Sequence, residues 1–202
     1  MGISVKPLAG LAAVLMLIGN SGSVAHGQAQ HVRWDIINIA FGNPPTLTPG
    51  GVADAFARFP PPPAGPAMRI RLSGSGTFVA PASRGTSSAV TGGGTWETFG
   101  SDGASTGSGT YSVTSLAFWQ FTSLFAQGPI DLIGPDGANG NAVLRIEYSD
   151  GSEGILGIGC HGPGAPNGIV EGVIASKGDV TYWDAGAPVP NVNTNRTTFH
   201  LE

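Results

Sequence analysis

The sequence predicts an all-β fold, a single antiparallel β-barrel of about eight to ten strands, with a β-sandwich as the alternative. One observation is a six-residue pattern that is repeated at residues 73–78, 91–96 and 106–111. It reads [Ser/Thr]-Gly-[Ser/Gly]-Gly-Thr-aromatic, and we call it the repeated phrase. The other is a hairpin signal, because residues 142–160 alternate on both sides of Asp150-Gly151. Both features are typical of antiparallel strands joined by short turns.

The repeated phrase has a period of two residues, so each copy is predicted to be a strand. Its glycines and its terminal ring share one face, and the hydroxyl residues share the other. The expected core faces are Ile70, Leu72, Gly74, Gly76 and Phe78 in the first copy, Val90, Gly92, Gly94 and Trp96 in the second, and Gly107, Gly109, Tyr111 and Val113 in the third.

Glycines on a core face weaken a strand unless something fills the space they leave. If the three copies form a meander, Trp96 lies near the glycines of its neighbours, while Phe78 and Tyr111 approach Gly92 and Gly94. Rings over glycines permit the coiling that a closed sheet needs, so this pattern favours the barrel. The alternative interpretation is that the glycines leave a cavity for a ligand.

Residues 1–29 have the features of a secretory signal peptide. Lys6 gives a positive start, an apolar run covers residues 8–18, and Ala25 and Ala29 each end a small-residue cleavage pattern. The apolar run is too short to span a bilayer well. We therefore expect a secreted or periplasmic protein whose mature chain has no integral membrane span and folds as a single β-domain over residues 30–202.

The charge of the mature chain argues against nucleic acid as a partner. Without Lys6, eight basic residues stand against 13 acidic residues, a net charge of −5. Arg69 and Arg71 are the closest basic pair, which is too few for a phosphate-binding patch. Cys160 is the single cysteine, so no intrachain disulfide is expected.

Other segments complete the predicted domain. Strands are expected at residues 32–39, 169–176, 180–183 and 197–201, and a short helix between Thr48 and Phe59. Prolines at 60–63 predict an extended segment. Residues 116–125 are expected to form either a strand covered on both faces or a helical plug, and residues 128–141 a glycine-rich loop.

The Asp150-Gly151 turn predicts the register of its hairpin. With a two-residue turn, Ser149 pairs with Ser152, which places Ile146 opposite Ile155 and Leu144 opposite Gly157. Cys160 then points outward. The expected inner face is Leu144, Ile146, Tyr148, Ile155, Gly157, Gly159 and His161, with Arg145 and Glu147 outward.

No motif in the sequence predicts a catalytic residue, a metal site or a cofactor. Residues 157–162 match Gly-x-Gly-x-x-Gly, but a proline-rich turn follows where dinucleotide binding requires a helix. The acids and amides of residues 131–141 lack the spacing of a calcium loop. Only His161 lies beside a predicted core face, with Tyr148 and Glu171 as its expected partners.

The overall pattern resembles that of small secreted all-β proteins of unknown function. This resemblance rests on the Gly-Thr-aromatic strands and on the turn Gly159-Cys160-His161-Gly162. The strand count and the glycine pattern are also similar to those of calycin and dirigent-like barrels. The second similarity implies an architecture and assigns no residue a role.

Three functions are compatible with these features. The first is an exported, non-enzymatic binding module that holds a small apolar, aromatic or sugar ligand at a barrel mouth lined by His161, Trp96, Tyr111 and Tyr148. The second is an isomerase or cyclase with His161 as proton carrier. The third is a structural or interaction protein of the cell surface. For His161, the competing interpretation is a hydrogen bond to the adjacent turn.

Overall fold

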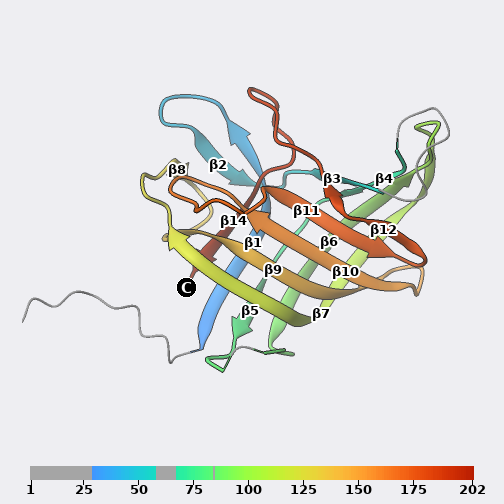
Figure 1. Ribbon diagram of the computed structural model, residues 1–202, viewed down its shortest axis with the longest axis horizontal. Helices are drawn as coiled ribbons and strands as arrows, with labels where there is room; N and C mark the ends of the chain where they lie inside the picture. The colour runs from blue at the N-terminus through green and yellow to red at the C-terminus, as the bar shows by residue number, and fades with distance from the viewer. Residues whose placement is uncertain (1–28, 58–66, 84) are drawn as a thin grey trace, which may run out of the picture.

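The computed structural model describes residues 29–57, 67–83 and 85–202 of the chain (Figure 1). Those residues form 14 β-strands and no helix. Accordingly, no helix of this part has the length and apolar character of a membrane span. The expected signal peptide, apart from Ala29, and the proline segment at 60–63 lie outside the described residues.

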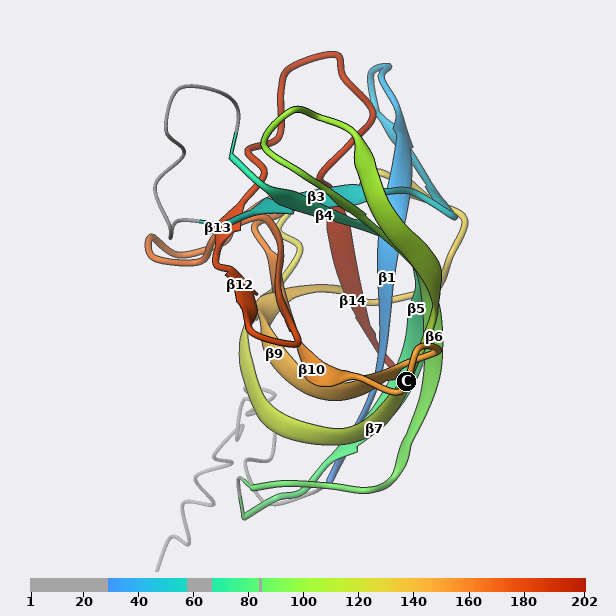
Figure 2. The same cartoon turned by 90° about the vertical axis from the view of Figure 1, so that its right-hand side faces the viewer.

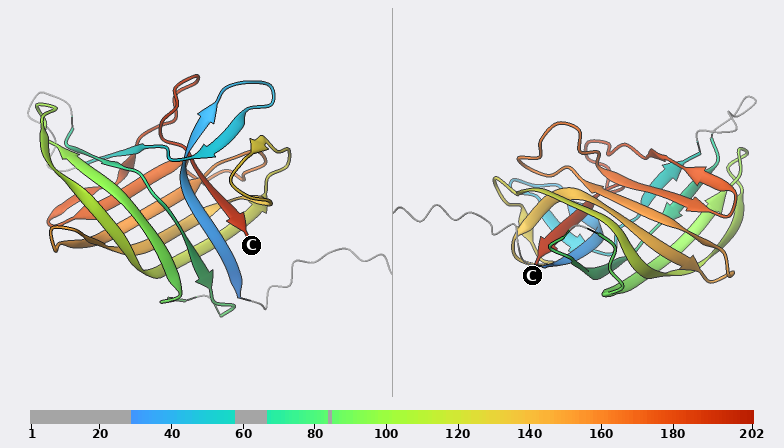
Figure 3. Two further views of the ribbon diagram at one scale, coloured as in Figure 1. Left: turned by 180° about the vertical axis from the view of Figure 1, so that it is seen from behind. Right: turned by 60° about the horizontal axis from the view of Figure 1, so that its bottom comes forward.

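Six antiparallel strands close into a barrel, which confirms the all-β barrel predicted from the sequence. Each strand pairs with the next, and the last pairs again with the first. Figure 3 shows four of them, β1, β5, β6 and β7, side by side from behind. In order around the barrel the strands are β1 (Gln30–Ala40), β5 (Ser75–Ala80), β6 (Val90–Phe99), β7 (Ser105–Leu124), β9 (Gly137–Tyr148) and β14 (Thr197–Leu201).

Two sheet extensions leave this barrel and approach each other. One continues from β9 through β10 (Glu153–Cys160), β11 (Gly172–Lys177) and β12 (Val180–Tyr182). The other continues from β6 through β4 (Arg69–Leu72), β3 (Ala53–Phe56) and β13 (Asp184–Ala185). Strands β3 and β11 lie in contact, so the extensions meet on one side of the molecule (Figure 2).

The strands outnumber the expected eight to ten because several are short or divided. The single strand predicted from Arg69 to Phe78 is bent at Ser73-Gly74 into β4 and β5, and both parts pair with β6. Two further short strands are β2 (Thr46–Pro49), which pairs with β1, and β8 (Ile130–Asp131), which pairs in parallel with β2.

The core faces predicted for the three repeats are confirmed. Their large apolar side chains are buried together in one cluster with residues of β1, β9, β10 and β14. The buried members from the repeats are Ile70, Leu72, Phe78, Trp96, Tyr111 and Val113. Period-two alternation was therefore a sufficient guide to which side of these strands faces inward.

The arrangement of rings over glycines is confirmed for Trp96 on the third repeat, whereas the nearest atoms at Gly74 and Gly76 of the first repeat belong to other residues. A Cβ atom added at Gly107 would lie 3.4 Å from the Trp96 ring, and one added at Gly109 would lie 3.0 Å from Trp96 Nε1. Trp96 thus packs on the third repeat, as the meander predicted. Because Gly107 and Gly109 have no side chains, the Trp96 indole can approach the backbone of the third repeat closely.

At Gly92 and Gly94 the nearest atoms belong to the backbone of the β4–β5 bend, whereas rings were expected. A Cβ atom at Gly94 would lie 1.8 Å from the Ser73 carbonyl oxygen, and one at Gly92 would lie 2.2 Å from the Ser75 carbonyl oxygen. The backbone at the β4–β5 bend thus fills the space. Tyr111, the cross-strand partner of Gly94, reaches over β6 to this bend, where its hydroxyl donates to the Ser73 carbonyl at 2.9 Å, so its predicted approach to Gly94 is confirmed.

The helix expected between Thr48 and Phe59 is wrong. Residues 53–56 form β3, which pairs with β4 and has Ala53, Asp54 and Ala55 all buried. The Asp54 carboxylate accepts hydrogen bonds from Arg71 on the adjacent strand, 2.8 Å from Arg71 Nε. This cross-strand ion pair and the backbone pairing of β3 with β4 favour a strand here, although the apolar residues have helical spacing.

Residues 116–124 continue β7, so the strand alternative is confirmed and the helical plug is wrong. The strand is covered on one face only. Phe118 and Leu124 are 48% and 44% exposed on its outer side. The loop expected at 128–141 is also shorter, because it contains β8 and because β9 begins at Gly137.

The hairpin at Asp150-Gly151 is confirmed, but its predicted register is wrong by one residue. The loop holds three residues, 149–151, and the Tyr148 amide donates to the Ser152 carbonyl at 2.8 Å. Gly151 has φ +83°, as in a type I turn followed by a glycine bulge. The Asp150 side chain stabilises this turn by accepting from the Ser152 amide at 3.1 Å.

The one-residue shift turns over every side chain of β10. Leu156 pairs with Leu144, and Leu156, Ile158 and Cys160 are buried on the core side. The expectation that Cys160 points outward is therefore wrong. Gly157 and Gly159, expected inside, pair with Val143 and Asn141 and face the outside of the barrel.

Gly94→Val is expected to lower the midpoint of urea unfolding, because its Cβ would collide with the Ser73 carbonyl oxygen. Overpacking of this kind costs about 1–3 kcal/mol. The matched control Ser75→Val adds the same side chain to the outer face of β5 and should leave the midpoint near that of the wild type. Circular dichroism measures the unfolding midpoint of each variant. An equal decrease of the midpoint in Gly94→Val and Ser75→Val would contradict the assignment of faces.

Candidate functional site

Three of the four expected ligand-binding residues lie together at one end of the barrel. The Trp96 and Tyr148 rings meet edge to face with their centroids 5.7 Å apart, and the Tyr111 and Tyr148 centroids are 6.3 Å apart. All three side chains are at most 5% exposed. They form a packed aromatic cluster, which we call the aromatic end.

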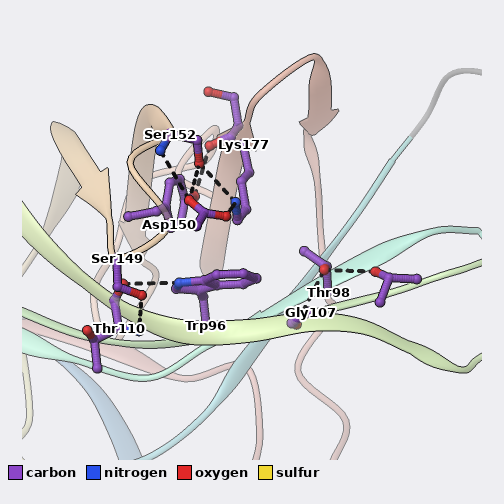
Figure 4. Close-up of polar contacts among 11 residues, drawn as sticks. Trp96, Thr98, Gly107, Thr110, Ser149, Asp150, Ser152 and Lys177 are labelled. Carbon is purple, nitrogen blue, oxygen red and sulfur yellow. Dashed lines mark hydrogen bonds and ion pairs between the residues drawn. The ribbon is translucent and has the colours of Figure 1, made fainter.

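The polar atoms of the aromatic end are already bonded within the protein. Trp96 Nε1 donates to the Thr110 carbonyl at 3.0 Å (Figure 4), and the Tyr148 hydroxyl donates to the Ser176 carbonyl at 2.8 Å. Burial raises the pKa of both Tyr111 and Tyr148 above the ordinary tyrosine range. These hydroxyls are therefore neutral donors whose hydrogen bonds hold strands together.

Lys177, at the end of β11, covers the aromatic end from outside. Its ammonium lies 4.2 Å from the centroid of the Trp96 ring and 4.8 Å from that of Tyr148, within the range of cation–π attraction. The same ammonium donates to Ser152 Oγ at 2.9 Å and to the Asp150 carboxylate (Figure 4). The protein's own cation thus occupies the place where a mouth ligand was expected.

His161 lies away from the aromatic end. It follows the last residue of β10, whereas the aromatic end adjoins the turn before β10, and the eight residues of that strand span about 26 Å. The His161 ring is exposed, and its Nδ1 is 2.8 Å from the Ile169 carbonyl oxygen. The structure therefore brings His161 to its adjacent turn and not to Trp96, Tyr111 or Tyr148.

Glu171, one expected partner of His161, contacts its backbone. Glu171 Oε2 accepts from the His161 amide at 2.6 Å, and Oε1 accepts from the Thr197 amide at 2.7 Å. Burial raises the pKa of the Glu171 carboxyl, although these two hydrogen bonds oppose the shift. This carboxylate joins the loop after β10 to β14, which is a structural role.

A different site lies on the outer face of β9, β10 and β11. Because Gly157 and Gly159 of β10 have no side chains, the sheet has a depression between the flanking strands. Val143 and Ile174 lie on either side of Gly157, and Gly172 lies beside Gly159. The resulting hollow, which we call the outer trough, has a volume of about 720 Å³.

Large exposed apolar side chains border the outer trough. Phe118 of β7 is 48% exposed, Val170 before β11 is 62% exposed and Trp183 after β12 is 58% exposed. Clustered exposure of this kind marks interaction sites more often than scattered surface residues do. The described residues that line the trough are Phe118, Asn141, Ala142, Val143, Gly157, Ile158, Gly159, Val170, Gly172, Ile174, Trp183, Asp184 and Ala185.

Sequence reasoning missed the outer trough because of the register error in β10. The signal was present, since Gly157 and Gly159 alternate with Leu156, Ile158 and Cys160 in the printed sequence. With a three-residue loop, this alternation places the glycines outside. Trp183 carried a second signal, an aromatic residue at the end of a short strand beside no expected core face.

Comparisons of the chain with protein-family models, with curated proteins and with solved structures gave no match.

Lys177→Met is expected to raise the pKa of the Asp150 carboxyl, which hydrogen bonds from Lys177 and Ser152 hold at about 2. An ordinary aspartate titrates near 3.9, so the stability from this lowered pKa is complete above about pH 4 and is lost as the pH falls toward 2. Carboxyl ¹³C NMR titration measures both values. Lys177→Arg, which keeps the charge, is the control, and an unchanged Asp150 titration in Lys177→Met would refute the pairing.

Proposed function

We propose that the chain is an exported, non-enzymatic binding module that holds a small apolar, aromatic or sugar ligand in the outer trough. The observation that carries this proposal is the clustering of exposed Phe118, Val170 and Trp183 around one hollow of about 720 Å³. Hollows of roughly 300–1,000 Å³ lined by apolar side chains with a few polar groups are the usual form of small-molecule sites.

The size of the barrel supports an outer site over an inner one. Even eight strands enclose an interior just wide enough for side chains or one small ligand, and this barrel closes with six. Its interior holds large, fully buried side chains such as Trp34, Phe78 and Phe199. A ligand of ordinary size therefore finds room on the outside of the sheet.

A binding role is supported over an isomerase or cyclase role by the position of His161. The Nδ1 atom of its ring lies within hydrogen-bonding distance of the Ile169 carbonyl oxygen, and His161 is not among the residues that line the outer trough. A proton carrier must lie within hydrogen-bonding reach of the atom it serves. Among the described residues that line the trough, the polar side chains are Asn141 and Asp184, which suit recognition of a ligand.

Native mass spectrometry of the protein purified from its producing cells tests the proposal. We expect a co-purified small molecule, and we expect Trp183→Ala to weaken binding of that molecule about tenfold, or 1.4 kcal/mol, through lost stacking. Phe41→Ala is the matched control, because Phe41 is a 43% exposed aromatic residue on the β1–β2 hairpin, outside the trough lining. Equal affinity in Trp183→Ala and the wild type would contradict the site.

A second function, an interaction protein of the cell surface, is favoured by a separate apolar patch. Asn193 joins the β1–β2 hairpin to the loop before β14, since its Oδ1 accepts from the Ile39 amide at 2.6 Å. Phe41, Val189 and Val192 are exposed on these two neighbouring segments.

This second function predicts that Phe41→Ser releases more of the exported protein into the medium, because the variant weakens attachment at the apolar patch. Immunoblotting of cell and medium fractions measures the release. Trp183→Ala, outside the patch, is the control. Unchanged retention in Phe41→Ser would count against a cell-surface role.

A further inference from the structure

We infer that the outer trough selects a flat, uncharged ring ligand that carries one hydrogen-bonding substituent. This inference rests on the proposed function and names the ligand class of the same site. Three properties of the trough support it: the shape of its floor, the charge of its lining and the single amide that faces it.

The floor of the outer trough favours a flat ligand. Gly157 and Gly159 carry no side chain, and both are buried beneath neighbouring groups. The neighbouring groups lean over these positions. The Ile174 side chain lies 2.5 Å from the place of a Gly157 Cβ, and the Val170 carbonyl oxygen lies 2.0 Å from that of a Gly159 Cβ. No side chain therefore stands up from β10 at these two positions, and this low floor offers most contact area to a flat ligand.

The length of the outer trough sets the size of the ligand. Phe118 lies on β7 and Ile174 on β11, which are separated by β9 and β10. Three strand spacings span about 14 Å, which matches a ligand of about two to four rings. Trp183, beyond β11, and Phe118 offer aromatic faces at opposite flanks of this span, where ring edges and faces interact favourably.

The charge of the lining favours an uncharged ligand. None of the described residues that line the trough is Lys, Arg or His, so an anionic group would meet no counter-ion among them. Among these described lining residues, Asp184 is the one that is charged, and it is already engaged in an interaction within the protein. The mature chain is acidic as a whole, which further disfavours an anion. Burying a charge without a partner is costly.

Asn141 supplies the hydrogen bond. Its Oδ1 lies 3.1 Å from the place of a Gly159 Cβ, directly beside the floor. In the part of the chain that the structure describes, the Asn141 side chain makes no hydrogen bond and is half-buried. An amide both donates and accepts, which suits one hydroxyl, amine or carbonyl substituent. A sugar presents several hydroxyls around its ring, and a single amide would leave most of them unbonded beside apolar side chains.

Two fluorescent probes that differ in one charged group test this inference. 2-Naphthylamine is an uncharged, planar two-ring amine, and 6-amino-2-naphthalenesulfonate is the same planar amine with a sulfonate. We expect saturable binding of the uncharged probe that is at least about tenfold tighter than that of the sulfonate, and no displacement by cellobiose. Trp183→Ala should weaken binding of the uncharged probe about tenfold, and the control Phe41→Ala should leave it unchanged.

A second pair of probes tests Asn141. Competition with naphthalene, which is equally planar and lacks the amine, should show that the wild type prefers the amine about five- to tenfold, because a hydrogen bond contributes roughly 1 kcal/mol. Asn141→Leu keeps a side chain of similar size and should bind the two compounds equally. A preference that persists in Asn141→Leu would remove Asn141 from the site.

The outcomes separate the ligand class from the proposed function. Two results would overturn the flat, uncharged ligand class: binding of the sulfonate as tight as that of the uncharged probe, or displacement of the probe by cellobiose. If that binding or displacement is lost in Trp183→Ala, the trough is retained as a binding site. Failure of every probe to show binding that depends on Trp183 would overturn the proposed function itself.

Discussion

The three-residue turn at 149–151 is the constraint on which the rest of the structure depends. It pairs Tyr148 with Ser152, and so it fixes which side of β10 faces the core. A turn one residue shorter would direct Gly157 and Gly159 toward the core and Leu156, Ile158 and Cys160 toward the outside. The barrel would lose part of its core, and the outer trough would be filled by apolar side chains. Gly151 is essential to this choice, because its φ of +83° is a conformation that residues with a Cβ rarely adopt.

Glycine serves two opposite purposes in this protein. In β6 and β7 it allows close approach on the inside, where Trp96 packs on Gly109 and where the β4–β5 backbone lies against Gly94. This close approach lets strands bend strongly enough to close a narrow barrel. On the outer face of β10, glycine instead lets the Ile174 side chain and the Val170 carbonyl lie low over the strand, at the floor of the trough. Glycine thus contributes both to the packed interior and to the outer trough. The register of each strand decides whether its glycines face the interior or the trough.

Local patterns predicted the fold well and the site poorly. Period-two alternation and turn residues are local signals, and they were sufficient for the strands, the core faces of the repeats and the hairpin at Asp150-Gly151. The length of the hairpin loop was not recoverable, because Asp-Gly occurs both in two-residue turns and in three-residue turns with a bulge. That single ambiguity placed His161 on an inner face. The partner of the aromatic end was equally hidden, since Lys177 reaches Trp96 from a strand 81 residues later in the sequence.

The position of the outer trough couples binding to the stability of the sheet extension. Strands β10, β11 and β12 lie outside the closed ring of the barrel and are attached to it through β9. The lining of the trough reaches from Phe118 on β7, within the ring, to Trp183 and Ala185 at the far side of the extension. A ligand that touches both flanks therefore adds a connection that the backbone ladder lacks. Because binding to the folded state alone stabilises that state, ligand should protect the amides of β11 and β12 from exchange more than those of β1 and β5.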